Sequence, residues 1–199
     1  FGSRAFTGQV REQELFATCR DGQTIWEKIK AAGLQPEGLA GAVASYPVKA
    51  YVELHIEQGG VLERDGLDIG IVTGIVGITR GSITVTGTAN HAGTTPMHMR
   101  DDALVKAARF IVFVHEEARR GNDMVATIGQ VHVSPGAVNV IPGEARLAIE
   151  MRSMNPARIK VAIERFKLCA AALGSVQVEM GLEKPPVLMD SQLVDLIEE

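Results

Sequence analysis

The spacing of apolar residues changes from helical to strand-like along the first quarter of the chain. Apolar side chains recur every three or four positions between residues 25 and 32, with Asp21 as the expected N-cap and Gly33 as the stop, which predicts a helix. After a linker rich in Gly and Pro, residues 51–57 alternate in polarity, which predicts a half-buried strand. These elements predict part of an α/β layer.

From residue 77 onward the pattern predicts a separate α+β region. Apolar residues occupy alternate positions in four segments that we expect to be strands: 82–87, 124–133, 145–152 and 176–182. A helix is expected between the first two strands and another between the last two. The element order is therefore β-α-β-β-α-β, which predicts a split-βαβ, ferredoxin-like arrangement of four antiparallel strands with two helices on one face.

The two helices of this region have apolar faces that we expect to pack against the strands. The first helix is expected to be capped by Asp101 and Asp102. Its apolar face is predicted to contain Leu104, Ala108, Ile111, Val112 and His115. The second is capped by Asn155 and Pro156 and keeps a 3.6-residue period. Its apolar stripe contains Ile159, Ala162, Ile163, Phe166, Cys169, Ala170 and Leu173.

Composition and charge exclude several classes of partner. The chain has 199 residues, and 46% hydrophobic content with 22% charged residues is typical of a globular protein. A net charge of -4 gives no basic surface for nucleic acid, and no apolar run is long enough to cross a membrane. Cys19 and Cys169 are too few and too far apart for a disulfide framework, which predicts a cytoplasmic protein.

His55 is the first candidate for chemistry. The alternation of residues 51–57 places it on the same strand face as Glu53 and Glu57. A metal ligand at the end of a sheet and a buried histidine hydrogen-bonded to one of these carboxylates explain the pattern equally well. A metal at His55 would need ligands from elsewhere, because no second histidine follows at the zincin spacing.

Three further candidates lie in or next to the α+β region. His91 follows a strand and precedes a turn rich in Gly and Pro, where a side chain can face a ligand. Asn139 lies in a loop between two strands, and Arg152 ends the following strand with a guanidinium suited to a carboxylate. Taken singly, each is better explained by turn chemistry, by solvation or by an ion pair of Arg152 with Glu150.

Four motifs occur together in order along the chain. They are Glu53–Gly59 (ELHIEQG), Ala89–Met97 (ANHAGTTPM), Val138–Gly143 (VNVIPG) and Met151–Ser153 (MRS). Together they resemble the M20-type metal-dependent amidohydrolases of the hydantoinase/carbamoylase family, which includes N-carbamoyl-L-amino acid hydrolases, allantoate amidohydrolases and β-ureidopropionases. The resemblance covers essentially the whole chain.

The resemblance implies an α/β catalytic-domain remnant plus an α+β ferredoxin-like lid and dimerisation domain. Residues 1–76 would belong to the metal-binding catalytic domain, residues 77–183 to the lid, and residues 184–199 to the return into the catalytic domain. The family binds two divalent metal ions, such as zinc, manganese, cobalt or nickel, and forms homodimers through the lid.

The resemblance also assigns roles to the four candidates. His55 matches a metal ligand, and His91 matches the catalytic histidine that reaches across the dimer to polarise the scissile carbonyl. Asn139 and Arg152 match the pair that holds the substrate carboxylate. The implied reaction is hydrolysis of a linear amide or ureido C–N bond in an N-carbamoyl amino acid or related ureido acid.

The chain looks like a piece of a longer protein. It begins with Phe1, ends in an amphipathic helix, and has no counterpart of the family's remaining metal ligands or general base. We therefore expect these residues alone to be inactive and to have no metal bound. The alternatives are a dimerisation or ligand-binding module without catalysis, in which His55 is structural, and an enzyme with allantoate-type specificity.

Overall fold

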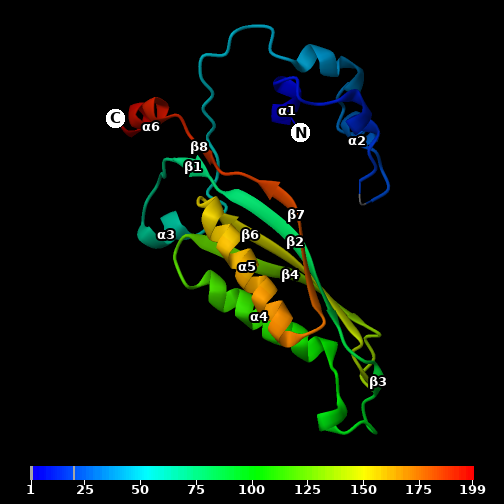
Figure 1. Ribbon diagram of the computed structural model, residues 1–199. Helices are drawn as coiled ribbons and strands as arrows, with labels where there is room; N and C mark the ends of the chain where they lie inside the picture. The colour runs from blue at the N-terminus through cyan, green and yellow to red at the C-terminus, as the bar shows by residue number, and fades with distance from the viewer. Residues whose placement is uncertain (1, 20) are drawn as a thin grey trace. The chain divides into compact units, whose positions relative to one another are not determined.

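The chain divides into two compact units. The computed structural model describes residues 2–19 and 21–199; the first unit ends at Val61, and the second runs from Leu62 to Glu199 (Figure 1). Residues 62–76 group with the second unit because β1 (Gly74–Ile75) pairs with β8 (Val187–Leu188). The functional boundaries predicted at 76/77 and 183/184 stay predictions.

Unit 1 consists of short helices joined by irregular segments. They are α1 (Gly2–Phe6), η1 (Glu12–Phe16), α2 (Ile25–Ala31) and η2 (Pro36–Ala42). The predicted helix is present, but its N-cap is Thr24 rather than Asp21. The Thr24 hydroxyl accepts a hydrogen bond from the backbone N–H of Glu27, and the Glu27 carboxylate accepts one from the backbone N–H of Thr24. Both exposed backbone amides at the start of the helix are therefore satisfied. Asp21 instead forms an ion pair with Lys28.

The predicted strand over residues 51–57 is wrong for this structure. The segment is irregular, and the side chains on both expected faces are exposed: Tyr51 by 72%, Leu54 by 98% and Ile56 by 76%. Polarity alternation makes a strand only where a neighbouring strand supplies the hydrogen-bond ladder, and no described strand pairs with this segment.

Unit 2 is built on a four-stranded antiparallel sheet. Its strands β2 (Gly77–Thr86), β4 (Met124–Ser134), β6 (Glu144–Ser153) and β7 (Val176–Lys184) lie in the order β4-β6-β2-β7. Helices α4 (Ala103–Ala118) and α5 (Pro156–Leu173) cover one face of this sheet (Figure 1). The predicted element order and antiparallel pairing are confirmed. The smaller elements are α3 (Val61–Asp65), β3 (Asn90–His91), η3 (Met97–Met99), β5 (Val140–Ile141) and α6 (Ser191–Glu198).

The core of unit 2 lies between the sheet and its two helices. Along β6 every second residue is buried, which is the alternation expected of a strand with one face on the core. Phe110 of α4 and Phe166 of α5 are fully buried and meet edge to face, with ring centroids 6.0 Å apart. The predicted stripe of α5 is confirmed, because its members are buried or half-buried.

The predicted apolar face of α4 is wrong. Its members are largely exposed, including Leu104 by 39% and Val112 by 60%. The face that packs on the sheet contains Ala103, Ala107, Phe110, Val114 and Glu117. Apolar residues extend around more than half of this helix, so two of its faces fit the helical period. The face with small alanines allows the helix to approach the sheet more closely. The cap at Asp102 is confirmed.

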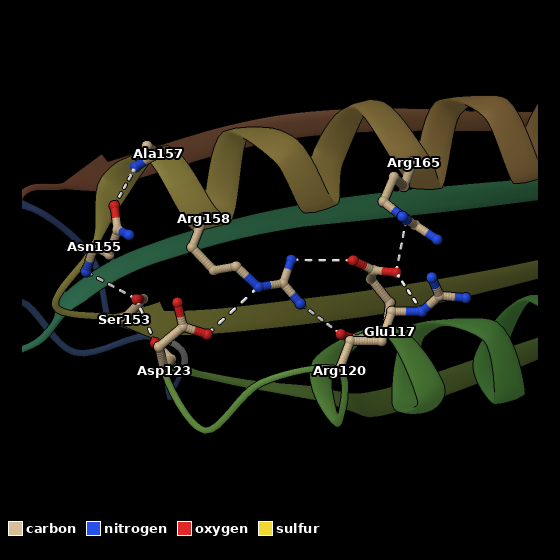
Figure 2. Close-up of polar contacts among 8 residues, drawn as sticks. All are labelled: Glu117, Arg120, Asp123, Ser153, Asn155, Ala157, Arg158 and Arg165. Atoms are coloured by element: carbon tan, nitrogen blue, oxygen red, sulfur yellow. Dashed lines mark hydrogen bonds and ion pairs between the residues drawn. The ribbon is translucent and has the colours of Figure 1, made fainter.

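A buried carboxylate joins the two helices of unit 2. Glu117 is 2% exposed, and its side chain lies 3.0 Å from Nη1 of Arg158, 2.7 Å from Nε of Arg165 and 3.2 Å from Nε of Arg120 (Figure 2). Arg158 also donates to the Glu117 backbone carbonyl at 2.6 Å. The Arg165 contact lacks hydrogen-bond geometry, so it acts as a charge contact only. Three arginines therefore compensate one buried charge.

Two composition-based expectations can be compared directly with the structure. Cys19 and Cys169 are both free thiols. Among the described residues, no helix combines the length and the apolar character that crossing a bilayer requires.

Candidate functional site

Two of the predicted site residues lie side by side at one end of unit 2. The short strand β3 pairs antiparallel with β5, so that His91 lies opposite Val140. Next to this pair, the backbone N–H of Ala92 donates to the carbonyl oxygen of Asn139 at 2.9 Å. His91 and Asn139 are therefore neighbours, and both are exposed to solvent.

The hydrogen bonds around His91 determine which ring nitrogen can donate. Its Nδ1 accepts the backbone N–H of Gly93 at 3.0 Å, so Nδ1 carries the lone pair. In the neutral imidazole the proton is then on Nε2, which is left as a hydrogen-bond donor. Such a donor, held on an exposed turn, can stabilise negative charge that develops on a substrate oxygen.

Arg152 lies on the open face of the sheet, opposite to the helices. Its Nε donates to Oε1 of Glu150 at 2.6 Å, and Oε2 of Glu150 accepts from Nε of Arg80, also at 2.6 Å. In the described part of the chain, the terminal nitrogens of Arg152 have no hydrogen-bond partner, so they can bind a carboxylate through two parallel bonds. Glu150 thus holds the guanidinium by one edge and leaves the other edge open.

The two arginines depress the pKa of Glu150. The hydrogen bond from Arg152 makes the largest contribution to lowering the pKa of this carboxyl, and that from Arg80 is next. The stabilisation from this contact is complete above the ordinary pKa of 4.5 and is lost as the pH falls through the lower value of the folded state.

We expect carbon-13 NMR of the Glu150 carboxyl to show a titration midpoint below 4.5, because both arginines favour its charged form. In an Arg152→Gln variant the midpoint should rise toward the ordinary value. An unchanged Glu150 midpoint in the variant would mean that the Arg152 contact is absent in solution.

Arg152 and Asn139 do not meet within one copy of the chain. Asn139 precedes the first residue of β6, whereas Arg152 is the ninth residue of this ten-residue strand. At a rise of about 3.4 Å per residue, Arg152 lies about 27 Å along the strand from Glu144. In Figure 1, β3 lies at one tip of unit 2 and the connection from β6 to α5 lies near the opposite end. One molecule therefore cannot use both side chains on one small carboxylate.

His55 lies on the exposed segment of unit 1. Its Nδ1 is 2.5 Å from the carbonyl oxygen of Ile56, so Nδ1 carries the proton and Nε2 presents a lone pair. The alternative of a buried histidine is wrong for this structure, because His55 is exposed and its Nδ1 meets the carbonyl oxygen of Ile56.

The arrangement at His55 fits a single metal ligand, since metal-bound histidines commonly donate their other N–H to a carbonyl. Across residues 2–19 and 21–199, however, no group of three or more His, Cys, Asp and Glu side chains could hold a metal ion. The described residues therefore do not assemble a metal centre.

Sequence reasoning did not find Arg80. This residue is 70 positions away from Glu150 and meets it only through the pairing of β2 with β6, where the two residues are direct partners. The period-2 alternation of β2 could have placed Arg80 on the open face, but only a known register would have placed it opposite Glu150.

Comparisons with known proteins give one match to a domain within unit 2 and further matches to most or all of the chain. Residues 73–175 match the M20 peptidase dimerisation domain. An N-carbamoyl-L-amino acid amidohydrolase of Geobacillus stearothermophilus is 47% identical over 155 residues, which cover 77% of this chain and 38% of that protein. An allantoate amidohydrolase of Escherichia coli (strain K12) is 32% identical over 206 residues, which cover 100% of this chain and 50% of that protein.

A solved structure shows the same fold. A hydantoinase/carbamoylase family amidase from Burkholderia phymatum matches with a TM-score of 0.83 at 32% identity, over 98% of this chain and 50% of that one. A second amidase of the family, from Burkholderia ambifaria, gives a TM-score of 0.82 at 32% identity, over 98% of this chain and 49% of that one.

The matched domain takes up just over half of the chain and contains helices α4 and α5 and the strands of the four-stranded sheet, apart from β7. Residues 73–175 of unit 2 thus form a domain of the M20 peptidase dimerisation class. The chain belongs to the hydantoinase/carbamoylase family of M20 proteins. It spans 38% and 50% of the length of the two curated relatives described above.

Proposed function

We propose that the full protein hydrolyses a linear C–N bond in an N-carbamoyl amino acid or a related ureido acid. The observation that carries this proposal is the pairing of β3 with β5, which makes His91 and Asn139 neighbours along the backbone, while the hydrogen bond from Gly93 to Nδ1 leaves the proton of the neutral His91 ring on Nε2. A neutral donor beside an amide suits recognition of a polar substrate whose carbonyl gains negative charge. The relatives named for N-carbamoyl amino acid and allantoate hydrolysis support the same reaction class.

His91 is the catalytic residue in this proposal. Its Nε2–H donates to the ureido carbonyl oxygen, and the bond strengthens as that oxygen becomes an oxyanion. Arg152 binds the substrate carboxylate through its two terminal nitrogens, while Glu150 keeps the guanidinium in place. Asn139 also binds the carboxylate end of the substrate.

This division of roles requires two copies of the chain. Arg152 is about 27 Å along β6 from Glu144, and Asn139 lies in the loop before Glu144. A small substrate is therefore reached by both side chains only if each comes from a different subunit. In our proposal His91 and Asn139 of one subunit act on the substrate held by Arg152 of its partner. Each homodimer then contains two sites, and neither is complete without both chains.

The dimer interface in this proposal uses the edge of the sheet and the free face of α4. β4 is an edge strand, and its Val125 and Val131 are 62% and 45% exposed. The adjacent α4 exposes Val112 by 60% and Val105 by 49%. Pairing of two β4 edges would bury these side chains, so that residues 77–183 act as a ferredoxin-like lid and dimerisation domain.

The metal chemistry belongs to the first segment of the chain in this proposal. Residues 1–76 contribute His55 as one ligand through Nε2, and residues 184–199 lead back into the same catalytic domain. Two divalent ions, such as zinc, manganese, cobalt or nickel, would supply Lewis-acid polarisation and a nucleophile at neutral pH.

An assay of ammonia release tests the proposed reaction. The full-length protein is first freed of metal and then supplied with zinc, manganese, cobalt or nickel in separate assays. With metal it should hydrolyse N-carbamoyl amino acids or allantoate, and a chelator should abolish this activity. The 199-residue chain alone should release no ammonia under the same conditions, because one histidine cannot hold two ions. If the full-length protein hydrolyses no ureido acid, the proposed reaction is excluded. If the 199-residue chain alone releases ammonia, the claim that the reaction needs metal ligands outside this chain is excluded.

A second candidate function is that of a dimerisation module without catalysis. The observation that favours it is the exposed apolar surface of α4 and β4, which a partner copy would cover whether or not a reaction follows. The two functions are compatible in one protein. Only the catalytic one requires His91 to keep a donor at Nε2.

A further inference from the structure

We propose that Arg100 and Gly93 are positioning residues that hold His91 with its Nε2–H facing outward. This inference rests on the proposed catalytic role of His91 and deepens it. The segment concerned comprises residues 91–100, called here the His91 turn. Nothing in the four family-like motifs singles out Arg100, because it lies beyond the last residue of the second motif, Met97.

Arg100 ties together two carbonyl groups of the His91 turn. Its Nη2 donates to the carbonyl oxygen of Ala92 at 2.5 Å, and its Nε donates to that of Thr95 at 3.0 Å. These carbonyls lie on either side of Gly93, so the guanidinium spans the part of the turn that contacts the imidazole. Among the described carboxylates, none forms an ion pair with Arg100. The half-buried Arg100 side chain therefore binds the backbone of the turn.

The turn is closed a second time through His91 itself. The carbonyl oxygen of His91 accepts the hydroxyl of Thr95 at 2.8 Å and the backbone N–H of Thr95 at 3.2 Å. Because Arg100 fixes Thr95 through its carbonyl, the backbone of His91 is held from both sides. Charge-assisted bonds from a guanidinium to carbonyl groups are stronger than neutral ones, so the loss of Arg100 releases the whole turn.

Gly93 fixes the imidazole ring by two means. Its N–H donates to Nδ1 at 3.0 Å, which selects the tautomer with the proton on Nε2. A Cβ atom at this position would lie 3.1 Å from Cε1 and 3.4 Å from Nδ1 of His91. The ring thus packs against the bare backbone of Gly93, and even a methyl group there would displace it. Only glycine permits both the contact and the hydrogen bond at their observed distances.

Kinetics of the full-length protein test the effect on the reaction. Arg100→Ala should lower kcat on an N-carbamoyl amino acid about 100-fold, because small displacements of a catalytic group are costly, and should change KM by less than about threefold. Arg100→Lys should give an intermediate kcat, since the lysine ammonium can replace only part of the hydrogen bonds that the guanidinium donates. Gly93→Ala, which keeps Arg100, should also lower kcat and provides the test if Arg100→Ala does not fold. Lys160→Ala removes an exposed charge from α5 and should have no effect.

A double-variant comparison shows whether Arg100 acts through His91. In a His91→Ala background, Arg100→Ala should lower kcat by less than about twofold further, because the group that it positions is already absent. The same loss in both backgrounds would overturn the proposal, since Arg100 would then act independently of His91.

Nitrogen-15 NMR of the 199-residue chain provides a readout that does not depend on activity. The His91 ring should show a lone pair at Nδ1 and a proton at Nε2 in the wild type, and a mixture of tautomers in Arg100→Ala and Gly93→Ala. Averaged shifts in the wild type, or identical shifts in the variants, would overturn the inference. If the full-length protein hydrolyses no ureido acid but the tautomer is fixed as described, the proposed function fails while the positioning of His91 stands.

Discussion

A mixed dimer with His91→Ala in one subunit and Arg152→Ala in the other should retain about half of the wild-type activity. Each variant alone should lose about 10²–10³-fold in kcat or kcat/KM, as when one oxyanion or carboxylate contact is removed. In the mixed dimer, the intact His91 faces the intact Arg152 at one of the two sites, and both defects fall on the other site. Co-expression with two affinity tags and tandem purification isolates this species.

A matched pair of variants provides the control for the mixed dimer. His91→Ala combined with Asn139→Ala should stay at background activity, because both residues lie at the same end of unit 2 and every site then has one defect. Activity in this control, or none in the first mixed dimer, would show that the sites are not shared between subunits in the proposed way.

Glu117→Ala should lower the free energy of unfolding by about 3–5 kcal/mol, the range expected when one partner of a buried ion pair is removed. The Glu117 side chain is 2% exposed, and its loss leaves Arg158, itself 14% exposed, beside a cavity with only the exposed Asp123, 3.5 Å from its Nε, as a counter-charge. For a chain of this size we expect the thermal midpoint to fall by roughly 10 °C. Urea and thermal unfolding followed by circular dichroism measure both quantities.

Glu116→Ala provides the comparison for this effect. Glu116 is the preceding residue of the same helix and is exposed, so its replacement removes the same charge without uncovering buried arginines. We expect a change within about 0.5 kcal/mol. Equal destabilisation by the two substitutions would mean that the arginines around Glu117 are hydrated and that the network contributes little.

The features that could be predicted from the sequence are those determined by short segments. The caps at Asp102 and Asn155 and the stripe of α5 follow from neighbouring residues, and the structure agrees with them. The four strands of unit 2 were likewise recognisable from alternation alone. Their element order then limits the possible topologies to a few, which explains why the sheet was predicted correctly.

The features that could not be predicted depend on partners distant in sequence. Residues 51–57 have the alternation of a strand, but no described strand pairs with them. On α4, apolar residues occupy two faces, and only the packing against the sheet decides which one is buried. Asn139 lies before the start of β6 and Arg152 near its end, so the pair that the resemblance assigned to one carboxylate is far apart within one chain, and no local pattern contains that distance.

The pairing of β1 with β8 makes the four-stranded domain separable from the rest of the chain. Gly74 lies opposite Leu188 and Ile75 opposite Val187, so the chain enters and leaves the domain at a single hydrogen-bonded point. A segment whose ends are adjacent can be inserted into a host protein, or removed from it, while the host chain is rejoined by a short turn.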